Sequence, residues 1–292
     1  MKVEIGVSNF SFDVPHFSSF AELTRQFIEF ESLRDRFTQN SVSIVIANDI
    51  TKNKYFGLSV EEQIKNFEFG GDRGIQVAFQ QRLYRQYLKG YDYTSYSSED
   101  LKLKAKTELS AETTTYSLLY VPKIPISGHR FFRNNIEFSK HYELTLSLYP
   151  MDEESYYMRA QSHFTNITFQ SDCGSTLANI GDGGISNFSH SITKCLIALN
   201  NHQAEMKIPQ DLDILGIMAE CNCSTQGSNG KANMKFSFPE ISQNDVNCEY
   251  HLKPNKSNDP KDSTYYHKRI YFTFAEIQGD VRTFVASIGP HL

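Results

Sequence analysis

The chain ends in a pattern that leaves little choice of local fold: two apolar runs joined by a tight turn. Residues 268–274 read Lys-Arg-Ile-Tyr-Phe-Thr-Phe, a run rich in β-branched and aromatic side chains that is typical of a strand. Residues 278–280, Gln-Gly-Asp, are a turn signal, and residues 281–288 supply a second strand. The end of the sequence therefore predicts an antiparallel hairpin, which the chain leaves through the Gly-Pro pair at residues 289–290.

Basic side chains gather around this predicted hairpin. Residues 248–253 and 267–272 each place His, Lys or Arg beside apolar residues, and another His follows the last strand. RNA cleavage without a metal needs a base, cations for the phosphorane charge and an acid, which His, Lys and Arg can provide. The alternative is that these residues are solvated strand ends that protect an edge strand. The candidate catalytic residues, for which we expect no metal, are His251, Lys253, Arg269 and His291.

The same region resembles the end of RelE/ParE-type toxin domains. In that family a strand with a Leu-Lys pair precedes a strand with an Arg-hydrophobic-Tyr pattern and a closing hydrophobic strand. Here Lys253, Arg269 and Tyr271 match the pattern best. The segments that carry the resemblance are residues 249–253, 268–272 and 285–292.

The resemblance implies a small antiparallel sheet flanked by helices, covering residues 201–292. RelE-like members cut mRNA on the ribosome with scattered Lys, Arg, His and Tyr residues, whereas ParE-like members act on gyrase. The present chain is much longer than a free-standing toxin. We therefore expect a bacterial toxin-like or antiviral defence effector that acts on RNA by metal-independent cleavage, with an antitoxin-like protein as a further partner.

Four further residues are candidates for substrate binding. Lys268 and Tyr271 lie in the first strand of the predicted hairpin. Arg130 and Arg133 lie in residues 128–135, which combine basic and aromatic side chains suited to a phosphate backbone or a stacked base. A loop-to-strand surface segment is the alternative interpretation of residues 128–135.

Two metal sites are weaker alternatives. Cys221, Cys223, Cys248 and His251 offer ligands of the right chemistry for zinc, although Cys-x-Cys is an unusual spacing. The competing interpretation places the cysteines in the core as small hydrophobic residues.

The acidic residues Asp213 and Glu220 are loosely similar to the acidic strands of PD-(D/E)XK nucleases, which would make the chain a metal-dependent DNA nuclease. Asn222 occupies the position of the Lys in that motif. An acidic turn that leads into a core strand is the simpler interpretation.

Composition limits the class of protein. The net charge of −5 argues against a nucleic-acid footprint over the whole surface, but not against a local basic site. Five cysteines suggest reduced thiols and a cytoplasmic location, and no apolar run of about 18 residues is present to cross a membrane. The 22 Phe and 16 Tyr residues also suit an alternative function, a non-catalytic interaction or sensor subunit of a defence complex.

The pattern of elements predicts an α+β fold. A mixed α/β region is expected over residues 1–200, and a β-rich module with a small antiparallel sheet over residues 201–292. Apolar residues at helical spacing predict helices, and alternating or continuous apolar runs predict strands. The predicted helices include residues 19–37, 75–88 and 188–199, and the predicted strands include residues 42–46, 113–121, 142–149, 164–169 and 212–221.

Overall fold

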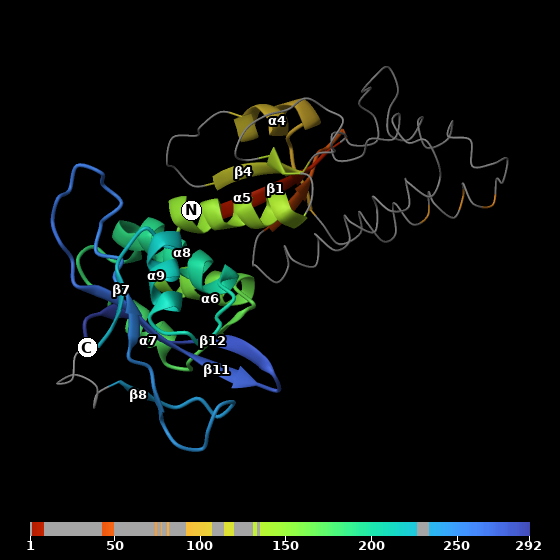
Figure 1. The fold of residues 1–292 in the computed structure, drawn as a ribbon. Helices are drawn as coiled ribbons and strands as arrows, with labels where there is room; N and C mark the ends of the chain where they lie inside the picture. Colours follow the sequence, from red (N-terminus) through yellow and green to blue (C-terminus); the bar gives the residue numbers. More distant parts are fainter. Residues whose placement is uncertain are drawn as a thin grey trace. The chain divides into compact units, whose positions relative to one another are not determined.

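The chain forms two compact units, Met1–His141 and Tyr142–Leu292. The computed structural model describes residues 2–8, 43–49, 92–106, 114–119, 131–132, 135–226 and 234–292, with isolated helical positions at 74, 77 and 81. Both units combine helices and strands, so the predicted α+β class is confirmed (Figure 1). Residue 200, where the sequence predicts a boundary, lies inside helix α8 (Ile185–Asn201) of the second unit.

The first unit is built on a parallel sheet with the strand order β3-β2-β1-β4-β5. The order reverses at β1, which is the arrangement of doubly wound α/β sheets. Ile5, Val7 and Ile46 are buried, as residues of parallel strands usually are. The elements are β1 (Lys2–Val7), β2 (Ser43–Ile46), β3 (Asp92–Tyr93), α4 (Ser98–Lys106), β4 (Thr114–Leu119) and β5 (Phe131–Phe132).

The second unit packs helices against a mixed sheet with the strand order β6-β12-β11-β10-β7. Its strands pair antiparallel except for β6, which is parallel to β12. The helices are α5 (Asn135–Leu148), which crosses the boundary between the units, α6 (Glu153–His163), α7 (Cys173–Ala178), α8 and α9 (Gln210–Met218). The strands are β6 (Ile167–Phe169), β7 (Cys223–Thr225), β10 (Tyr250–Leu252), β11 (Lys268–Ile277) and β12 (Asp280–Pro290).

The predicted terminal hairpin is confirmed. β11 and β12 pair from Lys268 opposite Pro290 to Ile277 opposite Asp280. The two loop residues between them both have positive φ, 54° at Gln278 and 90° at Gly279, as a type I′ turn requires.

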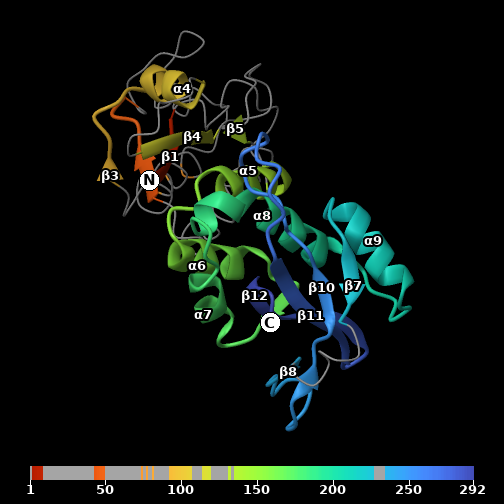
Figure 2. The ribbon, with the colours of Figure 1, turned by 90° about the vertical axis from the view of Figure 1, so that its left-hand side faces the viewer.

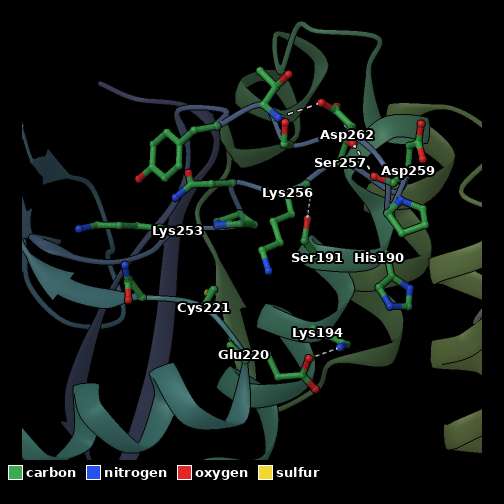
Figure 3. Close-up of a pocket in the computed structure, with 18 residues that line it drawn as sticks. His190, Ser191, Lys194, Glu220, Cys221, Lys253, Lys256, Ser257, Asp259 and Asp262 are labelled. Atoms are coloured by element: carbon green, nitrogen blue, oxygen red, sulfur yellow. Dashed lines mark hydrogen bonds and ion pairs between the residues drawn. The ribbon is translucent and has the colours of Figure 1, made fainter.

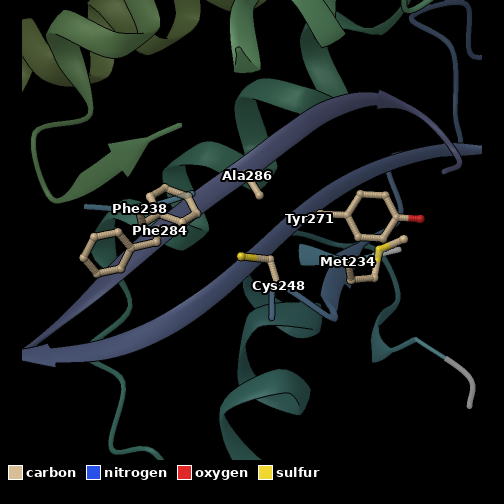
Figure 4. Close-up of a cluster of buried hydrophobic side chains, with 6 residues drawn as sticks. All are labelled: Met234, Phe238, Cys248, Tyr271, Phe284 and Ala286. Atoms are coloured by element: carbon tan, nitrogen blue, oxygen red, sulfur yellow. The ribbon is translucent and has the colours of Figure 1, made fainter. Parts of the chain in front are cut away.

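The two sides of this hairpin are covered differently. Helix α8 lies on one side, and the short pair β8 (Lys235–Phe236) and β9 (Val246–Asn247) lies on the other (Figures 1 and 2). The pairing shifts between Tyr271 and Phe272, where β12 has an extra residue. Beside this bulge a hydrophobic cluster closes the β8 side; its members are Met234, Phe238, Cys248, Tyr271, Phe284 and Ala286 (Figure 4).

Two strand predictions are wrong. Residues 142–149 alternate in polarity but lie largely in α5, where Phe138, Tyr142 and Leu146 are buried at a helical spacing of four. Residues 212–221 lie largely in α9, which buries Leu212 and Leu215 while one helix face stays in solvent. In both segments helical packing overrides a strand-like pattern.

Other predicted elements are confirmed or lie outside the described residues. The helix expected at residues 188–199 is part of α8, and the strands expected at 42–46 and 113–121 correspond to β2 and β4. The helix predicted at residues 19–37 and most of that at 75–88 lie outside the described residues. None of the helices that the structure describes is long and apolar enough to cross a membrane.

Candidate functional site

The central strand β11 directs alternate side chains to opposite faces of the sheet. Tyr271 pairs with His251 of β10 and with Ser287 of β12, so these three side chains share a face. Arg269, two residues before Tyr271, points to the same face, whereas Lys268 points to the other. The alternation therefore separates two adjacent basic residues that the sequence alone groups together.

Strand register and alternation place all four candidate catalytic residues on the face that carries Arg269. Together with burial, the positive charges of Lys253, Arg269 and His291 lower the pKa of the His251 imidazole. His267 is included with them because, with burial and Arg269, it lowers the pKa of His291. The backbone N–H of His291 also donates to the carbonyl of His267 at 2.9 Å. We call these five residues the cationic cluster. Among the described residues, no carboxylate lies within ion-pair distance of any of them.

Hydrogen bonds fix the tautomer of His251. Its Nδ1 lies 3.3 Å from the carbonyl oxygen of Glu249, which can only accept, so Nδ1 carries the proton. The Nε2 atom of the neutral ring then accepts from the hydroxyl of Ser224 at 3.2 Å. Burial, together with the charges of Lys253, Arg269 and His291, lowers the pKa of His251 to about 4, against the opposing effect of the Glu249 carbonyl. His251 is therefore neutral near pH 7, with a lone pair on Nε2.

The guanidinium of Arg269 is buried but only partly paired. Its Nη1 donates to Oδ1 of Asn255 at 2.9 Å and to the carbonyl of Lys268 at 2.7 Å. Its Nε and the hydroxyl of Ser287 on the same face are buried without a hydrogen-bond partner in the described part of the chain. A buried unpaired polar group costs about 1–3 kcal/mol, so an acceptor supplied by a ligand would stabilise this arrangement.

A cavity of about 700 Å³ adjoins the cationic cluster (Figure 3). Lys253 belongs to both, and Asn255, which holds Arg269, lines the cavity. The cavity lies between α8, the segment that follows α9 and the loop of residues 253–265. Tyr265, with 55% of its surface exposed, also lines it.

Three acidic residues line the cavity, and each is already engaged; Asp259 accepts from the backbone N–H of Lys261 at 2.9 Å. Glu220 pairs with Lys194 at 2.6 Å. Asp262 accepts hydrogen bonds from Ser257, Thr264 and Tyr266 and so shapes the loop. Within the residues that the structure describes, Lys253 and Lys256 have no ion-pair partner. Lys256 therefore offers an available ammonium group to the cavity, whereas the Lys253 side chain extends away from Lys256 (Figure 3).

The other candidate substrate-binding residues do not join the cluster. Lys268 is buried on the opposite face, where its Nζ donates to the carbonyl of Ile180 and to Asp182 at 2.6 Å and lies 5.1 Å from the ring centre of Phe188. Tyr271 is buried in the hydrophobic cluster. Both positions are structural in the folded protein.

The two remaining candidates for substrate binding, Arg130 and Arg133, lie outside the described residues.

The residues considered for zinc are separated by the fold. Cys248 packs in the hydrophobic cluster, while the Sγ of Cys221 lies 3.6 Å from the Sγ of Cys195. In the described ranges, no group of three or more His, Cys, Asp and Glu residues is arranged to hold a metal ion.

The acidic segment around α9 has a structural use. Asp211, only 2% exposed, accepts from Nε2 of His202 at 2.8 Å and from the backbone N–H groups of Glu205 and Lys207. These contacts close the loop before α9 onto its first turn. The expected acidic turn is thus present, but it leads into a helix rather than into a core strand.

We predict that Asp211→Ala lowers the free energy of unfolding by about 3 kcal/mol, because three donors lose their acceptor at once. Asp211→Asn, which keeps one oxygen, is the control and is expected to lose less. Urea unfolding measures both. Equal stability of all three proteins would contradict the structural assignment of Asp211.

Sequence reasoning missed several residues of the site. Ser224 and Ser287 lie on strands beside His251 and Tyr271, and Asn255 reaches Arg269 from a loop. Nothing in their local sequence marks them, because only strand pairing and loop closure bring them to the cluster. His267 belongs to the basic segment 267–272 singled out in the sequence, although it was not chosen there as a candidate catalytic residue.

No family model matches the chain, and comparisons with curated proteins and with solved structures found no match.

Proposed function

We propose that the second unit cleaves RNA without a metal ion, with the cationic cluster as its active site. The observation that carries this proposal is that His251, Lys253, Arg269 and His291 share one sheet face, where no described carboxylate lies within ion-pair distance of them. The positive charges of Lys253 and Arg269 favour a bound anion, and the unpaired Nε of Arg269 favours one with acceptor oxygens.

The residues suit a division of roles. Arg269 and Lys253 hold the scissile phosphate and stabilise the charge that develops on it. Nε2 of neutral His251 accepts the proton of the 2′-hydroxyl after Ser224 turns away. His291 donates a proton to the 5′-oxygen. The 2′-oxygen–phosphorus bond forms as the phosphorus–5′-oxygen bond breaks, which leaves a 2′,3′-cyclic phosphate and a 5′-hydroxyl.

The adjoining cavity supports a polynucleotide substrate. Lys253 lies at its junction with the cluster, Lys256 offers a second ammonium group, and Tyr265 exposes an aromatic ring for a base. Stacking on aromatic rings and contacts of Lys with phosphates are the usual means of binding single strands.

The biological role that fits this chemistry is a toxin-like or antiviral defence effector. The resemblance of residues 249–253, 268–272 and 285–292 to RelE/ParE-type domains supports it. We place the protein in the cytoplasm, where RNA is available and where its five free cysteines stay reduced. An antitoxin-like protein would restrain such an activity.

Purified protein incubated with labelled RNA and with labelled DNA of the same sequence, each with and without EDTA, tests the proposal. RNA cleavage that persists in EDTA is the expected result. DNA cleavage abolished by EDTA would instead favour the metal-dependent nuclease. Cleavage of neither substrate would favour a non-catalytic interaction subunit, and the exposed Ile214, Ile217 and Met218 of α9 would be the first surface to alter.

We predict that the cluster binds divalent anions more tightly at low pH. Burial, Arg269 and His267 lower the pKa of His291 in the free protein, and the pKa of His251 is about 4. A bound anion stabilises the protonated form of each imidazole ring and therefore raises the pKa of both histidines. Anion affinity consequently rises as the pH falls from the pKa of the anion-bound protein toward the pKa of the free protein.

Calorimetric titration with sulfate, which remains a dianion from pH 5.5 to 7.5, measures this effect. We expect affinity about tenfold higher at pH 5.5, which corresponds to one pKa unit. The variant His291→Gln is expected to lose part of the dependence. Equal affinity at both pH values would contradict the proposed electrostatics.

A further inference from the structure

Two cysteines from different helical segments meet beside the cavity. Cys195 lies in α8 and is fully buried, whereas Cys221 follows α9, is partly exposed and lines the cavity (Figure 3). Their sulfur atoms are 3.6 Å apart. A disulfide bond is about 2.05 Å long, so a sulfur movement of roughly 1.5 Å would join them.

The surroundings of the two thiols differ. The hydrogen bond from Cys195, followed by the backbone N–H and the ammonium of Lys253, lowers the pKa of Cys221 against the effect of burial. The same hydrogen bond and complete burial raise the pKa of Cys195. Cys221 therefore loses its proton more readily than Cys195, and the Cys195 thiol is placed to donate to the Cys221 thiolate when it forms.

Access also differs between them. Cys221 lines the 700 Å³ cavity and also a second cavity of about 410 Å³. A small oxidant can therefore reach Cys221, whereas Cys195 is fully buried. Cys223, the neighbour two residues later, lines the smaller cavity, but burial raises its pKa to about 12.

We propose that Cys221 is a site of oxidation by hydrogen peroxide and that Cys195 converts the product into a disulfide. The thiolate of Cys221 attacks one peroxide oxygen and the oxygen–oxygen bond breaks, which gives a sulfenic acid and hydroxide. The Cys195 thiol then gives its proton to this hydroxide, and the resulting Cys195 thiolate attacks the Cys221 sulfur. The sulfenic oxygen leaves as a second hydroxide, which takes up the proton that Cys221 released to solvent when it ionised. In total, two thiols and one peroxide give one disulfide and two waters.

The disulfide would tie α8 to the segment that follows α9, at the wall of the cavity next to Lys253. Oxidation also removes the thiolate whose formation the charge of Lys253 favours. The inference rests on the cysteine geometry alone and holds whether or not the cationic cluster cleaves RNA.

Intact mass and peptide mapping of the full chain after exposure to hydrogen peroxide test the proposal. We expect a loss of two hydrogens and a crosslinked peptide that joins Cys195 to Cys221. In Cys195→Ser, a sulfenic acid trapped by dimedone should accumulate on Cys221. In Cys221→Ser, both products should be absent.

The matched control is Cys223→Ser, which removes a neighbouring cysteine and should still form the crosslink. Alkylation of the native reduced protein should modify Cys221 at least about tenfold faster than Cys223, because thiolate content sets reactivity. A crosslink that uses Cys223, or a wild-type protein that keeps all its thiols at a peroxide dose that oxidises free cysteine, would overturn the proposal.

Discussion

Replacing Arg269 by alanine is expected to lower the rate of RNA cleavage by about 10³-fold, the effect of removing a donor that stabilises charge in a transition state. Arg269 lies on the sheet face where His251, Lys253 and His291 meet, and its Nε is buried without a partner in the described residues. Single-turnover cleavage rates at saturating protein measure the change without interference from product release.

A buried arginine also contributes to packing, so a second variant is needed. Arg269→Lys keeps the positive charge but loses the planar guanidinium that contacts Asn255 and the Lys268 carbonyl. We expect it to fold and to recover part of the lost rate. A thermal melt of each variant separates loss of fold from loss of chemistry. Wild-type rates in both folded variants would remove Arg269 from the site.

Replacing the adjacent Lys268 by alanine is expected to have the opposite profile: a stability loss of about 3 kcal/mol with no direct effect on chemistry. Lys268 lies on the other face of β11 and holds the buried carbonyl of Ile180 and the carboxylate of Asp182. Removing the Lys268 side chain leaves the buried carbonyl of Ile180 without a hydrogen-bond donor. It also opens a space beside the ring of Phe188.

Urea unfolding measures this loss, and Lys194→Ala is the matched control. Lys194 pairs with Glu220 at a site where both side chains are substantially exposed, 36% and 70%, so its removal should change stability by less than about 1 kcal/mol. If both substitutions lowered the free energy of unfolding equally, the buried contacts of Lys268 would contribute nothing to stability.

The contrast between Arg269 and Lys268 illustrates what the sequence could predict. Turn chemistry at Gln278 and Gly279, with apolar runs on either side, was sufficient for the hairpin. Because side chains alternate along a strand, the hairpin also determines which basic residues share a face. Deciding which face of β11 carries the cationic cluster required knowing which residues pack against Lys268. Those residues lie far away in the sequence.

The wrong strand predictions have the same origin. Residues 142–149 alternate like a strand, yet burial of Phe138, Tyr142 and Leu146 along α5 decides the outcome. Local pattern is a weak guide where tertiary contacts select among similar alternatives. The cysteine pair was likewise not predictable, because Cys195 and Cys221 are brought together only by the packing of α8 near the end of α9.

The proposed chemistry is tested most directly by the role of the substrate's own 2′-hydroxyl. Once the cleaved bond in a short RNA is mapped in the presence of EDTA, a single 2′-deoxy nucleotide is placed on the 5′ side of that bond. The mechanism at His251, Arg269 and His291 predicts that cleavage at this bond stops, and that the all-RNA product ends in a 2′,3′-cyclic phosphate. Continued cleavage of the substituted strand, or a product with a 3′-hydroxyl end, would contradict it.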